Sequence, residues 1–433
     1  MGIRLYIYIF ASVFFVLECN GQSRDNLFLN TSKKTDETNR LQHLSNDFNV
    51  AFLLPFCLEN NTILAVENLD SLLNINESLL NYDFYKKTKI SIDFFLGFLL
   101  SLNEFSNLNI SISLFDIKDG DESQGILQSI VKSRELNNMD LIVGPLFTDN
   151  FLFFADIFNK NIPIISPFSK KQKIIHNNEN VFQLETSLLN QLSVFSTHIF
   201  EEHFNDHILM VRQDTIFQSV INRAEDLNND NYTIDTILPN DILYSKVFYN
   251  HMDTSLINFE EILVQSNVID SIYHKLDTLG MRNIVVIPSD DNVFVTDLLS
   301  KLHACRDTGM IVYTLPILSD FDHISVYDLM DMKVTFPHNK IFNNSIMKDF
   351  ILNFYHHNNY FPTLKYAKVG YDVGMYFLDF LSIHGDVFPH IDEDVSKTIL
   401  GTEYRFKKEN NAGYRNNSTL ILRYNNFGYS IVD

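Results

Sequence analysis

Residues 139–171 constrain the fold more than any other part of this chain. They read MDLIVGPLFTDNFLFFADIFNKNIPIISPFSKK. Residues 141–143 and 162–165 are short apolar runs, each closed by a turn that contains proline. Between the runs lie apolar residues at helical spacing, Phe151, Phe154, Ala155 and Phe158. The pattern predicts a strand, a helix capped by Thr148 or Asp149, and a second strand.

Two apolar strands joined through a helix form a βαβ unit, so the strands are parallel and buried on both faces. The ligands of open α/β sheets bind at the carboxyl edge of such strands. The turns after residues 143 and 165 are therefore the first candidates for a functional site.

The rest of the chain repeats this alternation of strands and helices. We expect strands at 49–57, 110–116, 181–184, 207–211, 233–238, 283–288, 310–315, 402–406, 419–424 and 429–432. We expect helices at 89–105, 123–136, 216–227, 260–279, 293–303, 346–356 and 366–384. A long connection rich in Asn and Leu occupies 58–85. Gly370 lies within the last helix, where glycine permits close approach of another element.

Three passages resemble a known family. They are "DLIVGPL…FADIFNKNIPIISPFS", "NIVVIPSDDNVFVTDLLSKL" and "FPTLKYAKVGYDVGMYFLDFLSIHG", and the hairpin-like tail is a looser match. Over residues 48–433 the chain resembles the type I periplasmic binding proteins, which include the leucine/isoleucine/valine receptors of ABC importers. The resemblance implies two doubly wound α/β lobes with parallel sheets, connected by several crossovers.

The resemblance and the length of 433 residues predict a discontinuous domain organisation. The first lobe would comprise 48–187 and 332–386, and the second 188–331 and 387–433. Residues 332–336 would be the crossing back to the first lobe. Residues 22–47 are polar and aperiodic, and we expect a flexible leader there.

The first 21 residues have the pattern of a secretory signal. Arg4 precedes an apolar run at 5–17, and Cys19-Asn20-Gly21 has the small-x-small pattern of a cleavage site. The run is shorter than the roughly 20 residues that span a bilayer, so we expect cleavage, a periplasmic product and no transmembrane span in the mature chain. Lipid anchoring at Cys19 is the alternative, although Glu18 fits a lipoprotein signal poorly.

Composition limits the partners and the chemistry. The net charge of −21 argues against nucleic acid and anionic membranes as partners. The chain contains no nucleotide-binding, nucleophile-elbow or zinc-protease motif, so we expect neither an enzyme nor a bound cofactor or metal. His198, His203 and His207 do not share one helix face. Cys57 and Cys305 are expected to be separate packed thiols.

The turns at the carboxyl edges provide the candidate site. In amino-acid receptors of the family, the loops that correspond to 147–150 and 168–170 supply hydroxyls and small residues. Thr148, Asp149, Ser169 and Lys170 are the candidates in the first lobe, and Asp214, Ser289 and Asp290 in the second. Hydroxyls and a cation suit a ligand carboxylate, and an acid suits its ammonium group.

With these features, the resemblance to the type I periplasmic binding proteins implies an exported solute-binding protein. It would trap a small polar ligand, with an amino acid as the candidate class, in a cleft between the lobes and deliver it to an ABC permease. The alternative is a module without a small ligand that docks a cell-envelope protein such as a peptidoglycan synthase. Phe147 and Phe168, which stand where the family has small residues, favour that alternative.

Overall fold

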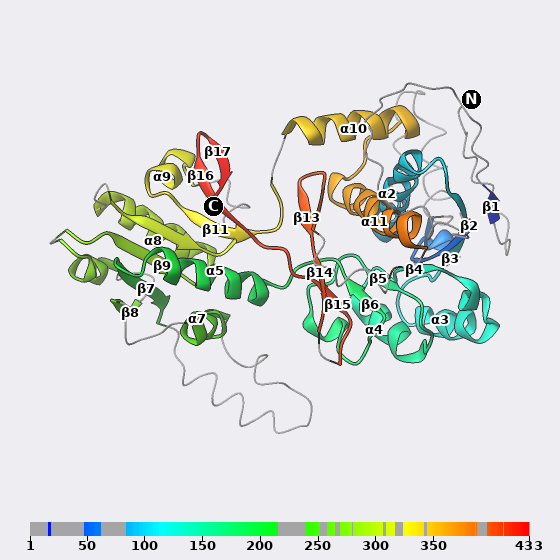
Figure 1. Cartoon of the computed structure of the whole chain (residues 1–433), viewed down its shortest axis with the longest axis horizontal. Coiled ribbons are helices and arrows are strands. Elements are labelled where there is room, and N and C mark those ends of the chain that lie inside the picture. Colours follow the sequence, from blue (N-terminus) through cyan, green and yellow to red (C-terminus); the bar gives the residue numbers. More distant parts are fainter. Residues whose placement is uncertain are drawn as a thin grey trace, which may run out of the picture. The chain divides into compact units, whose positions relative to one another are not determined.

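The computed structural model describes residues 16–18, 47–61, 84–214, 240–251, 258–264, 269–278, 280–305, 309–316, 324–341, 344–385, 387, 396–409 and 411–432. The chain divides into two compact units. The first comprises Met1–Thr186 and Asn343–Asn417, and the second Ser187–Phe342 and Ser418–Asp433. Figure 1 labels the elements. Within the described ranges, no helix is both long and apolar enough to cross a bilayer.

The first unit is built on an eight-stranded sheet with the order β1-β3-β2-β4-β5-β6-β15-β14. Its strands are β1 (Val16–Glu18), β2 (Asp47–Leu54), β3 (Asn109–Asp116), β4 (Leu141–Val143), β5 (Ile164–Ser166), β6 (Val181–Gln183), β14 (Phe406–Lys408) and β15 (Tyr414–Asn416). The pairs from β3 to β15 are parallel, while β1 and β14 pair antiparallel at the two edges. The predicted parallel strands at 141–143 and 162–165 are thus confirmed, the second as β5.

Helices cover both faces of this sheet. On one face lie α2 (Lys86–Ser101) and α11 (Leu364–His384), and on the other α3 (Glu122–Ser133) and α4 (Thr148–Ile157). The helix α10 (Asn344–Asn358) packs on α2 and α11, and 3₁₀ turns lie at Leu102–Glu104, Glu135–Asn138 and Gln172–Ile174. Alternate side chains of β2 enter different cores, since Phe52 packs with α2 and α11 and Leu53 packs with α3 and α4. This two-sided burial explains why the strands read as continuous apolar runs.

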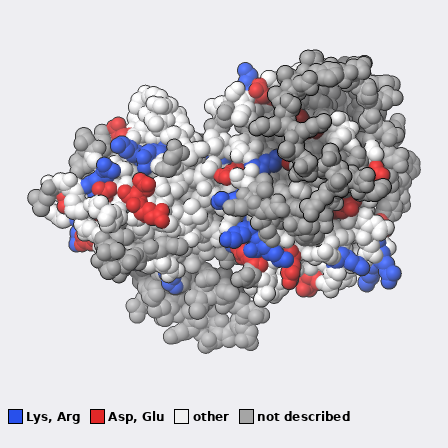
Figure 2. Space-filling view, in the orientation of Figure 1, with Lys and Arg blue, Asp and Glu red and all other residues white. Residues whose placement is uncertain are grey.

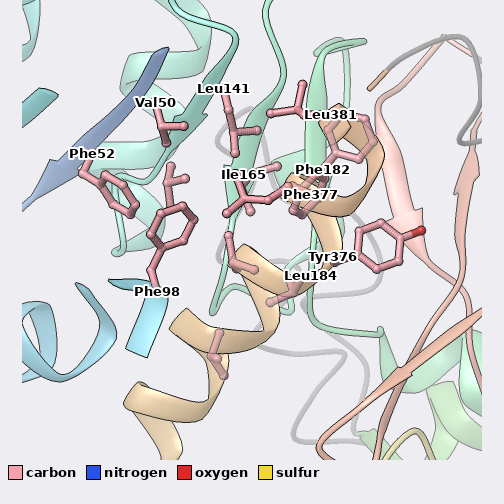
Figure 3. Packing of buried hydrophobic residues seen from close by; sticks show 14 of the residues in the cluster. Val50, Phe52, Phe98, Leu141, Ile165, Phe182, Leu184, Tyr376, Phe377 and Leu381 are labelled. Carbon is pink, nitrogen blue, oxygen red and sulfur yellow. The ribbon is translucent and has the colours of Figure 1, made fainter. Parts of the chain in front are cut away.

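Figure 3 shows the core between the sheet and α11. Phe182 of β6 lies edge-on to Phe377 of α11, with ring centroids 5.5 Å apart, and stacks on Tyr414 of β15 at 4.3 Å. Aromatic pairs of these geometries add to the free energy gained by area burial alone. The Phe-rich helices therefore serve the core, as their apolar spacing suggests.

A hairpin, β12 (Lys397–Ile399) with β13 (Thr402–Tyr404), lies against α11 through a buried polar cluster. The Asp372 carboxylate, fully buried in α11, accepts hydrogen bonds from Lys368 Nζ at 2.6 Å and the Tyr404 hydroxyl at 2.6 Å. Lys397 of β12 also donates to the Met375 carbonyl at 2.8 Å. Charge pairing offsets part of the cost of burying these groups.

The second unit has a seven-stranded sheet with the order β17-β16-β11-β10-β9-β7-β8. Its strands are β7 (His207–Gln213), β8 (Phe259–Val264), β9 (Asn283–Ile287), β10 (Ile311–Thr314), β11 (Thr335–His338), β16 (Leu420–Asn425) and β17 (Gly428–Ile431). Its helices are α5 (Leu188–Glu202), α7 (Asn240–His251), α8 (Asn292–Cys305) and α9 (Val326–Asp331), with a 3₁₀ segment at Ile269–Lys275. The helices α5 and α7 pack on one face, and α8 and α9 on the other.

The structure divides the chain between the units differently from the sequence prediction. Residues 332–342 belong to the second unit, because β11 pairs parallel with β10 and antiparallel with β16. Residues 387–417 belong to the first unit, because β15 pairs parallel with β6. Both segments provide interior strands, β11 and β15, whose backbone N–H and C=O groups are paired on both sides. Pairing of these backbone groups therefore decides where the chain passes from one unit to the other.

Two local predictions were wrong. The helix expected at 260–279 is instead β8 followed by a 3₁₀ segment, since β7 takes a parallel partner on that side. The helix α4 begins at Thr148 with Phe147 as its N-cap, and no side chain caps it. The predicted elements at 216–227 and 233–238, the leader, most of the signal and most of the 58–85 connection lie outside the described residues.

Candidate functional site

In the first unit, Thr148 and Ser169 meet at the carboxyl edge of the sheet. Thr148 opens α4 after β4, and Ser169 follows β5 in the next turn. The Thr148 hydroxyl donates to Ser169 Oγ at 3.1 Å, although the residues are 21 positions apart. Ser169 is 6% exposed, and its Oγ also accepts the Lys171 N–H at 3.4 Å, so its own O–H can act as a donor. The prediction that these two turns share one edge is confirmed.

The charged neighbours of this hydroxyl pair face water. Asp149 and Lys170 are both exposed. Asp149 lies in the first turn of α4, where a carboxylate favours the positive end of the helix dipole. Lys170 follows Ser169 directly in the chain and is the cationic residue of this turn.

Gln183 stabilises the Ser169 turn through two side-chain hydrogen bonds, and the sequence analysis missed this residue. Its side-chain amide donates to the carbonyl oxygens of Ser169 at 2.9 Å and Lys171 at 3.1 Å. Gln183 is fully buried, and its Oε1 has no hydrogen-bond partner among the described residues. Its place at the end of β6, the strand next to β5, was the signal available in the sequence.

Aromatic rings fill the space beside the hydroxyl pair. The Phe168 ring packs edge-on against Phe94 and Tyr366, with centroid distances of 5.6 Å in both cases. Lys87 Nζ lies 4.8 Å from the Phe147 ring centroid and also forms an ion pair with Asp119. Both phenylalanines are half-buried against the core of the unit. Side chains of this chain thus occupy positions where small residues would leave room for a ligand.

Cys57 lies at the same edge, in surroundings that disfavour the thiolate form. Its side chain is buried, and desolvation together with the nearby Asp116 carboxylate raises its pKa to about 11. Asp116 shapes this turn by accepting the backbone N–H groups of Cys57, Leu58 and Lys118 at 3.1, 3.2 and 2.9 Å. A thiol with a raised pKa carries little thiolate, the nucleophilic form, at neutral pH.

In the second unit, the turn after β9 carries two of the candidate residues. Ser289 is buried, and its Oγ accepts the Asp291 N–H at 3.3 Å, while Asp291 Oδ1 accepts the Phe294 N–H at 2.8 Å in the first turn of α8. These contacts give Ser289 a role in shaping the turn. Asp290 is half-buried, and Oδ2 of its carboxylate accepts the hydroxyl of Tyr244 from α7 at 3.3 Å.

Asp214 follows β7 at the same edge of the second sheet. Its side chain is exposed, and its N–H donates to the Val264 carbonyl at 2.8 Å, which continues the pairing of β7 with β8. Two residues earlier, Arg212 forms an ion pair with Glu261, which also accepts the Tyr249 hydroxyl. Burial and the Glu261 carboxylate raise the pKa of Tyr249 to about 12. The sequence analysis missed this group, because it depends on β8 being a strand.

His203 and His207, which follow α5, have structural partners, whereas Nε2 of His198, within α5, is buried without a hydrogen-bond partner among the described residues. His203 is buried, its Nδ1 lying 2.8 Å from Asp206 Oδ2 and its Nε2 lying 2.7 Å from the Tyr313 hydroxyl. His207 Nε2 lies 2.8 Å from the Lys275 carbonyl oxygen. Within the described part of the chain, no group of three or more His, Cys, Asp or Glu side chains has the geometry of a metal site.

Comparison with known proteins identifies the fold. No protein-family model and no curated protein matches the chain. A Rhodospirillum rubrum protein assigned to branched-chain amino acid ABC transport shares 13% identity, with 89% of this chain and 100% of that one covered and a TM-score of 0.57. A branched-chain amino acid ABC transporter periplasmic ligand-binding protein from Burkholderia xenovorans shares 9%, covering 89% and 94%, with a TM-score of 0.50.

The LpoA C-domain from Haemophilus influenzae, a regulator of PBP1A, shares 10% identity, covering 89% of this chain and 100% of that one at a TM-score of 0.48. At such identities, similarity is evidence of fold alone. The chain has the type I periplasmic binding protein fold, as the resemblance in its sequence implied.

Proposed function

We propose that this protein is an exported, non-enzymatic solute-binding protein that takes a small zwitterionic ligand of the amino-acid class and supplies it to an ABC-type importer. One observation supports this most directly. The Thr148–Ser169 hydroxyl pair lies at the carboxyl edge of one sheet, in a turn that continues into Lys170, and a half-buried acid, Asp290, follows a strand at the carboxyl edge of the other.

The first unit would bind the ligand carboxylate. Ser169 can donate its O–H to a carboxylate oxygen while it accepts the bond from Thr148, and Lys170 adds a charge-assisted donor. Gln183 would hold the Ser169 turn in place through its hydrogen bonds to the Ser169 and Lys171 carbonyl oxygens. Asp149, one residue from Thr148, would disfavour a second negative charge on the ligand and so select against diacids.

The second unit would bind the ligand ammonium group. The half-buried Asp290 carboxylate, which accepts the Tyr244 hydroxyl, would offer the ammonium group a negative charge. Asp214 is the second acid at this edge. Ser289 would act indirectly, because its Oγ accepts the Asp291 N–H and so shapes the turn that carries Asp290.

Export completes the proposal. The charged start, the apolar run at 5–17 and the small-x-small pattern favour a cleaved signal and a periplasmic protein. Lipid attachment at Cys19 would keep the protein in the same compartment. Intact-mass measurement of the protein purified from the envelope would distinguish a chain that begins at Gln22 from a lipid-modified one that begins at Cys19.

A thermal-shift screen with L-amino acids and short peptides tests the function. A ligand at 100 times its Kd adds about 2.7 kcal/mol to the free energy of unfolding. Ser169→Ala and Asp290→Asn should each remove most of that shift, whereas Thr398→Val, a change at an exposed residue of β12, should leave it intact. The absence of a shift across the screen would contradict the proposal.

A second candidate rests on the aromatic filling around Phe168. A ring held between Phe94 and Tyr366, with Phe147 beneath Lys87, fits a module that binds no small ligand and docks a cell-envelope protein instead. Phe168→Ser separates the candidates. If the Phe168 ring lines a ligand site, Phe168→Ser should change which amino acids raise the unfolding temperature. If the ring occupies the place of a ligand, no amino acid should raise the unfolding temperature of the wild-type protein.

A further inference from the structure

Two exposed aromatic side chains contact each other at one place on the second unit. Tyr327 of α9 is 67% exposed and Phe427 of the β16–β17 turn is 66% exposed. Their ring centroids are 5.2 Å apart, in an edge-to-face geometry. Val326 and Ile431 are further exposed apolar residues of the same elements. We call Tyr327, Phe427, Val326 and Ile431 the aromatic patch; Figure 1 shows α9 next to the β16–β17 hairpin.

Phe427 is exposed at a cost in backbone energy. The pairing of Asn425 with Gly428 leaves a two-residue turn, and Asn426 and Phe427 have φ values of 48° and 61°. Such turns favour glycine at the second position, because a side chain crowds the backbone in the left-handed region. A bulky apolar residue there gains little from folding when it remains in water, so its presence points to a use outside the fold.

The surroundings of the patch indicate the chemistry of what it contacts. Both charged side chains of α9, Asp328 and Asp331, are acidic. His303 Nε2 lies 3.6 Å and 3.4 Å from their carboxylates, and the two side chains remain 39% and 53% exposed. Residues 424–432 carry no charge, and Figure 2 shows the hairpin region largely white. The patch is therefore apolar at its centre, with acidic groups on the helix side. In the sheet order, β17 is the outermost strand on this side.

We propose that the aromatic patch docks an extended segment of a partner protein that carries apolar side chains flanked by Lys or Arg. Aromatic side chains dominate protein interfaces because they bury large areas at a low cost in side-chain entropy. The segment would lie along the outer edge of the sheet at β17, with its basic residues near Asp328 and Asp331. This proposal is independent of ligand binding, since none of its residues is a candidate ligand contact.

The test uses a phage-displayed library of random twelve-residue peptides, selected on the full-length protein and counter-selected on its Phe427→Gly variant. Glycine is favoured at this φ, so that variant should unfold at or above the wild-type temperature while it loses the ring. Selected peptides should combine aromatic or aliphatic residues with Lys or Arg. Synthetic copies should bind the wild-type protein with a Kd that rises with salt concentration.

Matched variants decide the outcome. Phe427→Gly and Tyr327→Ala should each weaken peptide binding more than tenfold, and Asp328→Asn with Asp331→Asn should weaken it several-fold and reduce the salt dependence. Val293→Ala, at an apolar residue of α8 that is 75% exposed, should change nothing. Acidic or uncharged selected peptides, no enrichment, or affinities unchanged by Phe427→Gly would overturn the proposal. So would dimerisation that Phe427→Gly abolishes, because the patch would then bind a second copy.

Discussion

Gly370 of α11 lies directly against the backbone of Phe94 in α2. A Cβ atom at position 370 would lie 1.8 Å from the Phe94 carbonyl oxygen. The relationship is reciprocal one turn away, where a Cβ at Gly97 would lie 1.9 Å from the carbonyl oxygen of Ala367. The two helices of the first unit therefore touch backbone to backbone, and no side chain fits between them.

Gly370→Ala should accordingly destabilise the protein. Neither carbonyl can move without disturbing its own helix, so we expect a loss of about 3 kcal/mol in the free energy of unfolding, at the upper end of overpacking effects. Urea unfolding followed by circular dichroism measures it. Gly125→Ala in α3, where the added Cβ would meet nothing within 4 Å, is the control and should add about 0.5–1 kcal/mol. Equal effects at both positions would contradict this account.

The sequence predicts this contact better than it predicts the polar sites. Gly370 stands within an apolar helical pattern, and glycine in such a position indicates close packing. The Thr148–Ser169 pair was likewise predictable, because parallel strands put successive turns at one edge. The Arg212–Glu261 pair was not, since it depends on the register of β7 with β8 and the pattern at 260–279 favoured a helix. The burial of Ser289 and the role of Gln183 depend on side-chain packing that no short pattern encodes.

The boundaries between the two units were likewise not predictable from local sequence patterns. The alternating apolar residues Met332, Val334 and Phe336 predict a strand equally well in either unit. Its partners, β10 and β16, are chosen by pairing across distant parts of the chain. Local pattern therefore fixes the type of an element more reliably than its place in a sheet.

Stability should fall in mild acid because of His203. Burial lowers the pKa of His203 below its ordinary value, and the Asp206 carboxylate opposes this only in part. A group whose pKa is lower in the folded state binds protons preferentially in the unfolded state, so stability is lost as the pH falls through about 6.5. Burial also lowers the pKa of His198, in the same direction. Arg282 and Arg423 are the nearby cations that further disfavour the protonated His203.

Unfolding in urea at pH 7.5 and pH 5.5 measures the effect. His203→Gln removes the titrating group and can keep one hydrogen bond, so its free energy of unfolding should change less between these two pH values than that of the wild type. His356→Gln, at an exposed residue of α10, should leave the wild-type difference unchanged. A wild-type protein that is more stable at pH 5.5 would refute the prediction.

The Asp372 cluster should be sensitive to the loss of its charge. Asp372→Asn leaves the Lys368 ammonium, whose side chain is 13% exposed, without its carboxylate, and should cost about 3–5 kcal/mol in the free energy of unfolding. The double variant Lys368→Met with Asp372→Asn removes both charges and should recover part of that loss. Thermal unfolding of the two variants beside the wild type makes the comparison. A double variant less stable than Asp372→Asn alone would show that the ion pair is not the cause.

Cys57 should resist thiol reagents in the folded protein. A shift of its pKa from 9.0 to about 11 lowers the thiolate fraction at neutral pH about 100-fold, and burial of the side chain blocks access as well. In a Cys305→Ser variant of the chain that begins at Gln22, Cys57 is the remaining thiol. Ellman's reagent should then react more than 100 times more slowly under native conditions than in 6 M guanidinium chloride. Comparable rates would mean that the turn after β2 opens readily, and the edge that carries Thr148 and Ser169 would then not be the rigid platform that ligand binding needs.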